Sequence, residues 1–275
     1  MSKKYISFSL WGSSRLYCEG AIENIACAKK YLPDFICRFY VAEDCPALAV
    51  LQQLDCEVVV MPNQKGIDRT NDKWVWQADH VAMFWRYFVI DEMHDGDVVI
   101  FRDCDSRISE RDKFVIEDWL KRPECVHRIA ENDSHHNSFC MGGMWGIKGG
   151  ELLGVCNAIC EWVEYYKNVN HPWIFVDLEF NTNVLAPAIG HKTIGYGHKL
   201  EIPLLPLNED ETHIGWVIKE EWRDQKFNPH TYLFNNGPYD KHGWYSLNDV
   251  SHPGKPTCEG VKERLKELKE NDKTE

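Results

Sequence analysis

The chain of 275 residues lacks several features that would assign it to a familiar class at once. No apolar run approaches the length of a membrane-spanning helix, so we expect no transmembrane segment. None of the eleven cysteines forms a C-x-x-C pair with another. No change of composition in the middle marks a linker, and we therefore expect a single domain.

Positive charge is also scarce. The 31 Lys and Arg residues stand against 43 Asp and Glu residues, which gives a formal net charge of −12. Surfaces that bind nucleic acid or anionic membranes are built from clustered Lys and Arg, so this charge balance argues against nucleic acid as a partner. An acidic protein that binds a phosphorylated substrate needs a cation at its site, and a metal ion would supply one.

The cysteines and the first residues indicate the compartment. The segment from Met1 to Tyr5 leads directly into a strand-like run and not into an apolar signal segment. Together with the scattered cysteines, this predicts reduced thiols in a cytoplasmic protein. Cys156 and Cys160 share a helix face, but no second pair of Cys or His lies near them in sequence, which disfavours a zinc site.

The first part of the chain alternates between predicted strands and helices. The apolar patterns predict strands over residues 5–10, 35–42 and 56–61, and helices over 17–31 and 47–54. This alternation is typical of a parallel sheet with crossover helices.

Two further segments precede the central motif. Residues 62–78 are polar and without periodicity, which predicts a loop or lid. A helix follows, with Val81, Trp85, Phe88 and Val89 on its apolar face and Arg86 off that stripe.

Asp103-Cys104-Asp105 is the most informative motif. It follows the short apolar run 98–102, which reads as a buried strand. Side chains alternate along a strand, so we expect Asp103 and Asp105 to point the same way. Carboxylates at this spacing suit Mg²⁺ or Mn²⁺, which complete their shell with water and substrate phosphate. Alone, however, such a motif is common and is also typical of a solvated turn.

Ligands of open α/β sheets bind at the carboxyl ends of the strands. The first strand ends in Ser9, Leu10 and Trp11, and the strand before the two aspartates ends in Arg102. If these ends are neighbours, one pocket holds an aromatic face for a base, hydroxyls for a ribose and a metal for phosphates.

The second half contributes fewer signals. Gly142 and Gly143 lie in a strand-like run, where glycine marks either close approach of a ligand or a tight packing corner. Asp177 and Glu179 stand near the start of a predicted helix. His213 is a candidate metal ligand, although a lone histidine is more often structural.

Prolines divide the region that follows into loops suited to an acceptor site. A charged helix over residues 261–269 and a polar tail are predicted to end the chain.

Part of this pattern resembles a group of nucleotide-sugar-dependent glycosyltransferases with the GT-A fold. The match covers residues 81–150, and it departs over residues 130–133, where Ala-Glu-Asn-Asp replaces Arg-Asp-His-Pro. The residues that carry it are the run from Phe101 to Arg107, Trp119, His127, His135 and the run from Gly142 to Gly146.

The resemblance implies a fold. We expect an α/β, Rossmann-like mixed sheet of the GT-A type, flanked by helices, in a single domain with loop-rich excursions towards the C-terminus. This domain would cover residues 1–258, with a nucleotide-binding half over 1–108 and an acceptor-side half over 109–258. Residues 259–275 would form the terminal helix and tail.

The resemblance also implies roles. Asp105 would be the principal ligand of Mn²⁺ or Mg²⁺, and Asp103 would reach the metal through water or contact the donor sugar. Arg86 and Arg102 would stabilise the diphosphate or hold the acids. The remaining contacts to the nucleotide-sugar donor would come from Ser9, Leu10 and Trp11 at the nucleotide and from Gly142 and Gly143 at the sugar.

A weaker similarity is to the retaining, glycogenin-like glycosyltransferases. It aligns their acidic motif with residues 177–182 and makes His213 a third metal ligand, although Leu178 and Thr182 depart from that motif. Asp177 or Glu179 would act as base in an inverting reaction, or stabilise the cationic sugar in a retaining one. The implied reaction moves a sugar from a UDP-sugar, or a GDP-sugar, to an acceptor hydroxyl, most simply on a glycan.

Three alternatives stay open. Phosphatases of the haloacid-dehalogenase type also place Asp-x-Asp after an apolar strand, but normally after the first strand of the domain. A sugar-1-phosphate nucleotidyltransferase would need a Gly- and Lys/Arg-rich loop after the first strand, of which residues 10–15 are a poor version. The eleven Trp residues also fit a carbohydrate-binding protein without catalysis.

Overall fold

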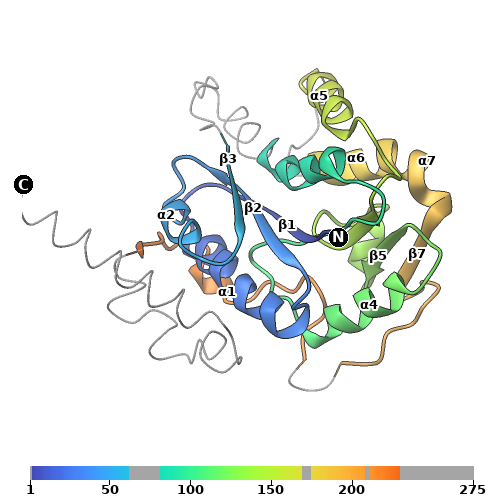
Figure 1. The fold of residues 1–275 in the computed structure, drawn as a ribbon, viewed down its shortest axis with the longest axis horizontal. Coiled ribbons are helices and arrows are strands. Elements are labelled where there is room, and N and C mark those ends of the chain that lie inside the picture. The colour runs from blue at the N-terminus through green and yellow to red at the C-terminus, as the bar shows by residue number, and fades with distance from the viewer. Residues whose placement is uncertain (1, 62–80, 169–174, 208–210, 230–275) are drawn as a thin grey trace, which may run out of the picture.

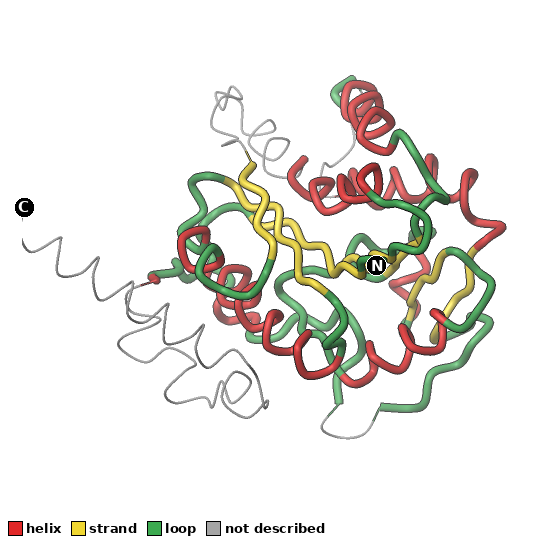
Figure 2. Tube along the Cα trace, in the orientation of Figure 1, coloured by secondary structure: helices red, strands yellow, loops and turns green. Residues whose placement is uncertain are grey.

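A computed structural model of the protein describes residues 2–61, 81–168, 175–207 and 211–229. Its centre is one seven-stranded sheet with the strand order β3-β2-β1-β4-β6-β5-β7. Helices cover both faces of this sheet (Figures 1 and 2). The strands are β1 (Lys4–Leu10), β2 (Ile36–Ala42), β3 (Glu57–Met61), β4 (Val98–Phe101), β5 (Val126–Ala130), β6 (Trp145–Lys148) and β7 (Thr193–Gly197).

The sheet is mostly parallel. β1 pairs in parallel with β2 and β4, β2 with β3, and β5 with β7. β6 runs antiparallel to both of its neighbours, β4 and β5. The prediction of a mixed α/β sheet flanked by helices is therefore confirmed, and the two expected halves of the chain share one continuous sheet.

The helices form a layer on each side. α1 and α4 lie along one face, and η2, α5 and α6 lie along the other (Figure 1). In the part of the chain that the structure describes, no helix has the length and apolarity needed to cross a membrane. The helical elements are α1 (Arg15–Tyr31), α2 (Leu48–Leu51), η2 (Ala82–Glu92), α4 (Glu110–Leu120), η3 (Asp133–Asn137), α5 (Val155–Tyr166), α6 (Val176–Phe180), η5 (Asn181–Leu185), α7 (Ala186–Ile189), η6 (Gly190–Lys192) and η7 (Glu220–Trp222).

The element η2 differs from the expected amphipathic helix. It is a 3₁₀ helix of 11 residues that packs between the sheet and α5. Because both sides are covered, Phe84, Trp85, Tyr87 and Val89 are all buried, and Arg86 is buried with them. Arg86, which the sequence places off the apolar stripe, is therefore covered as well.

The sequence predicts a helix around residues 113–121, and α4 begins earlier than that, at Glu110. The hydroxyl of Ser109 accepts the backbone N–H of Asp112 at 3.3 Å, and the Asp112 carboxylate accepts the backbone N–H of Ser109 at 2.9 Å. This capping box satisfies free backbone donors in the first turn, so the helix starts at Glu110. The Ser-x-x-Asp spacing is visible in the sequence and was the missed signal.

Some predicted strands differ from the observed ones, and two observed strands were not predicted. The strand-like run over 139–146 is a strand only from Trp145 onward, and the residues before it form turns. The strands β5 and β7 were not predicted. The expected lid over 62–78, the helix over 261–269 and the domain boundary at 258 lie outside the described residues.

A test of the sheet centre uses Gly146 on β6. A Cβ atom there would lie 2.6 Å from the carbonyl oxygen of Val99 on β4 and 2.6 Å from Cε1 of His127 on β5. Since the strand backbone cannot withdraw without breaking the ladder, Gly146→Ala should lower the free energy of unfolding by about 1–3 kcal/mol. Urea titration followed by tryptophan fluorescence measures this change.

The matched control is Gly190→Ala. Gly190 has helical dihedral angles, and the nearest atom to its Cβ would be Phe139 Cε2 at 3.8 Å. This variant should be neutral or slightly stabilising. Equal stability of the two variants would contradict the packing described for β6.

Candidate functional site

The strand order creates a switch point between β1 and β4. From β1 the chain moves to β2 and β3 on one side, and it then places β4 on the other side of β1. Connections that leave in opposite directions open a crevice at the carboxyl ends of the two central strands, where α/β proteins bind ligands. At this edge of the sheet, β1 ends with Ser9 and Leu10 and is followed by Trp11. Asp103 and Asp105 follow the end of β4.

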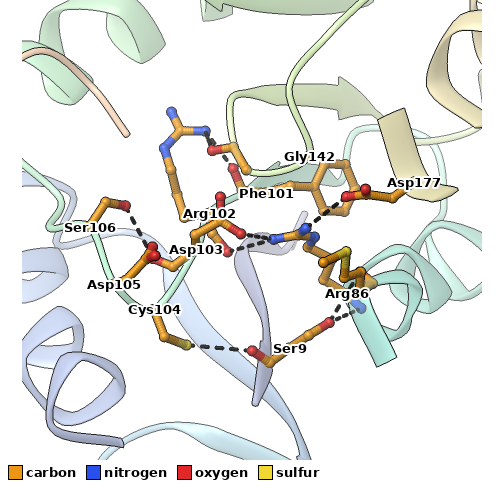
Figure 3. A network of polar contacts seen from close by, with 12 residues as sticks. Ser9, Arg86, Phe101, Arg102, Asp103, Cys104, Asp105, Ser106, Gly142 and Asp177 are labelled. Carbon is orange, nitrogen blue, oxygen red and sulfur yellow. Dashed lines mark hydrogen bonds and ion pairs between the residues drawn. The ribbon is translucent and has the colours of Figure 1, made fainter. Parts of the chain in front are cut away.

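The two aspartates occupy a turn and not the strand. β4 ends at Phe101, so the alternation of strand side chains does not extend to them, and this part of the expectation was wrong. The side chain of Asp103 is 43% exposed and faces Arg86, whereas that of Asp105 is 13% exposed (Figure 3). The two carboxylates therefore have different surroundings.

Arg86 is the centre of the network (Figure 3). Its guanidinium pairs with the carboxylate of Asp103 through Nη1 and with Asp177 Oδ2 through Nη2, the latter at 3.2 Å. Burial alone lowers the pKa of Arg86, but the charges of Asp103 and Asp177 outweigh burial and raise it. Arg86 is thus a permanent buried cation between two acids.

The backbone of Arg86 is held by β1. Its N–H donates to Ser9 Oγ at 3.0 Å, and its carbonyl oxygen accepts from Ser7 Oγ at 2.7 Å. The Ser9 hydroxyl, predicted to line the nucleotide, therefore positions η2 against β1.

Asp177 joins the site from the first turn of α6. Its Oδ1 accepts the N–H of Leu178 at 2.9 Å, and its Oδ2 contacts Arg86. Burial raises the pKa of Asp177, while Arg86 opposes that shift. Glu179, the other candidate acid, interacts instead with Tyr166 of α5.

The glycine pair lies directly on this network. A Cβ on Gly142 would meet Arg86 Nη2 at 2.7 Å, and one on Gly143 would meet Asp103 Cγ at 2.6 Å. Tyr87 Oη donates to the carbonyl oxygen of Gly142 at 3.3 Å, and this hydrogen bond holds the turn that contains Gly142. The described contacts explain both glycines by close packing of backbone on the charged groups.

Asp105 has a cationic neighbour that the sequence did not suggest. Arg223 Nη2 lies 3.9 Å from Asp105 Oδ2, and Arg223 Nη1 donates to Tyr17 Oη at 2.5 Å. Burial, and then the charge of Asp103, raise the pKa of Asp105 to about 6. No local pattern around Arg223 signals this contact, because it depends on how the chain returns to the sheet.

The segment that carries Arg223 crosses the site. Ile218 N–H donates to the carbonyl oxygen of Asp105 at 2.9 Å, and Lys219 Nζ donates to Glu23 Oε1 at 2.7 Å. Further along, Ser14 Oγ donates to the carbonyl oxygen of Arg223 at 2.6 Å. The segment thus connects the turn after β4 to the start of α1.

His213 does not join the two aspartates. Its ring packs on His135 at a centroid distance of 5.1 Å, and the next residue is held by a hydrogen bond from Ile214 N to Glu131 Oε1 at 2.8 Å. Within the described ranges, no three His, Cys, Asp or Glu side chains are grouped so that they could hold a metal. The grouping of His213 with Asp103 and Asp105 as a three-residue site is therefore not found.

Three other candidates occupy different places. Arg102 is buried and donates to Asp112 Oδ1 at 2.8 Å, so it anchors α4. Leu10 is buried in the core. Trp11 is partly exposed and packs edge-on against Trp85, with ring centroids 6.5 Å apart.

Comparison with known proteins adds no relative: no family model matches the chain, and no curated protein matches it.

Replacing Arg86 tests the network. Arg86→Met leaves Asp177 buried without its cation, which should cost about 3–5 kcal/mol of folding free energy near pH 7. Without Arg86 the pKa of Asp177 in the folded state rises further above its unfolded value, so the folded protein binds a proton more readily. The deficit relative to wild type should therefore shrink as the pH falls.

Urea titration between pH 5 and pH 8 measures both effects, and Asp177→Asn in the Arg86→Met background should recover part of the loss. Arg122→Met is the control, since Arg122 forms a partly exposed pair with Asp118 worth about 1 kcal/mol or less. A pH-independent loss equal to that of the control would show that Arg86 does not balance a buried charge.

Proposed function

We propose that the protein is a metal-dependent glycosyltransferase that uses a nucleotide-diphosphate sugar, with a UDP-sugar favoured. The observation that carries this proposal is the placement of Asp103 and Asp105 in the turn after β4, at the switch point beside β1. A crevice at this position suits a nucleotide, and two carboxylates beside it suit a metal-bound diphosphate.

The residues present fit a divalent cation held by two carboxylates. Asp105 is largely buried, lies next to another acid, and has its charge only partly balanced by Arg223 at 3.9 Å. Mg²⁺ and Mn²⁺ commonly use one or two protein carboxylates and take their remaining ligands from water and substrate. Asp105 and Asp103 would hold such an ion, which would offset negative charge on the leaving nucleotide diphosphate.

The other side chains of the site have separate roles in this proposal. Asp103 has one oxygen held by Arg86, so its orientation is set before any ligand arrives. Asp177 is buried next to Gly142 and forms an ion pair with Arg86. We therefore assign Asp177 a positioning role in place of the expected role as base. Arg223 adds positive charge next to Asp105. Trp11 offers an aromatic face at the end of β1 for the base.

Hydrolysis of the donor tests the proposal, because glycosyltransferases can pass the sugar slowly to water. Purified protein is incubated with UDP-glucose, UDP-galactose, UDP-N-acetylglucosamine or GDP-mannose, with Mn²⁺ or with EDTA, and the released nucleotide is measured. We expect release from one donor, with Mn²⁺ only. Asp105→Asn should reduce this release about a hundredfold or more, the scale at which loss of one charge-stabilising contact acts.

Glu161→Gln is the matched control, since Glu161 is an exposed acid on α5. It should hydrolyse the donor at the wild-type rate. Release from no donor, or undiminished release by Asp105→Asn, would refute the proposal. Metal-dependent cleavage of p-nitrophenyl phosphate instead would favour the phosphatase alternative.

A further inference from the structure

We propose that Trp216 is the surface on which a pyranose ring of the acceptor stacks, so that the acceptor is a glycan that presents an apolar sugar face. This inference rests on the proposed function and adds the residue that recognises the acceptor, which the acidic motif does not imply.

Trp216 is the most exposed of the tryptophans that the structure describes. Trp85, Trp119 and Trp145 are buried in the core, whereas 51% of Trp216 is exposed. A half-exposed indole presents an apolar face to the solvent, which suits a ligand that is apolar on one side.

The ring of Trp216 is held in place. It meets the His213 ring edge-on, with centroids 4.9 Å apart and planes at 87°. The backbone N–H of Trp216 donates to the carbonyl oxygen of His213 at 3.1 Å, which closes a turn. This turn includes Gly215, with a φ of +80°, and a Cβ there would lie 2.9 Å from Met144 Sδ. An aromatic ring fixed in this way loses little freedom on binding.

The position of Trp216 connects it to the candidate site. On one side of it, Gly215 packs against Met144, the residue after Gly143. On the other side, Ile218 bonds the backbone of Asp105. Trp216 is therefore held on a short segment whose two anchors lie next to the two aspartates.

Trp216 and Trp11 are attached to different parts of the sheet. Trp11 follows β1, on the side that continues to β2 and β3. Trp216 is tied through His213 to His135, which lies in the η3 element after β5. Because β4 stands between β1 and the β6-β5 pair, a donor base at Trp11 would leave the Trp216 side free for the acceptor.

The chemistry of the ring suits a sugar. One face of a pyranose carries axial C–H groups and is apolar, while its edge carries hydroxyls. An indole that is half exposed can cover the apolar face and leave the hydroxyls in water or directed towards the acids. Trp216 would then position an acceptor hydroxyl close to Asp103 and Asp105.

Binding of simple glycosides tests this role. Saturation-transfer NMR on the full chain with UDP and diamagnetic Mg²⁺ uses the methyl pyranosides of glucose, galactose, mannose and N-acetylglucosamine, which contain no aromatic group of their own. We expect wild type to bind at least one of them. Trp216→Ala should weaken that binding about tenfold, equivalent to about 1.4 kcal/mol, while Trp216→Phe should retain most of it.

Phe114→Ala is the matched control, since Phe114 is 54% exposed on α4. It should bind the glycoside as wild type does. The proposal is overturned if wild type binds none of the glycosides, or if Trp216→Ala binds them unchanged.

Donor hydrolysis by wild type separates this result from the proposed function. If glycosides bind in a Trp216-dependent way but no donor is hydrolysed, Trp216 forms a carbohydrate-binding surface and the proposed glycosyltransferase activity is refuted. Donor hydrolysis without Trp216-dependent binding would support the enzyme and refute this acceptor site.

Discussion

The buried charge of Arg86 is the constraint on which the arrangement of the site depends. A guanidinium removed from water costs several kcal/mol unless acids with good geometry surround it. Asp103 and Asp177 meet this need from the turn after β4 and from α6, and Arg86 itself comes from η2. The three elements are thereby held in one arrangement, and the backbone at Gly142 closes against it.

The two acids of the central motif have unequal electrostatic environments. Asp103 pairs with the buried cation Arg86 and is also partly exposed to water, so its charge is already stabilised. Asp105 is more buried, and its neighbour Arg223 lies at ion-pair distance without a close hydrogen bond. When burial and a neighbouring acid both disfavour the charged form of a carboxyl group, an added cation stabilises that charged form strongly. This difference favours Asp105 as the main metal ligand in the proposed enzyme.

Several site residues act one step away from any ligand. Ser9 holds the backbone of η2, Arg102 fastens the start of α4, and Tyr87 supports the turn at Gly142. Their partners show that they hold η2, α4 and the Gly142 turn in place around the two aspartates. Support of this kind is what a site needs to keep its carboxylates in position.

The sequence by itself determined the local features: the strand before Asp103, the alternation of strands and helices, and the acidic motif at a strand end. These follow from neighbouring residues through apolar periodicity and turn chemistry. Only the tertiary structure decided that Arg86 is buried between Asp103 and Asp177, that Arg223 faces Asp105, and that the strand ends at Phe101. The physical reason is that these contacts join residues far apart in the chain, so strand order and packing select them, and no local pattern encodes either one.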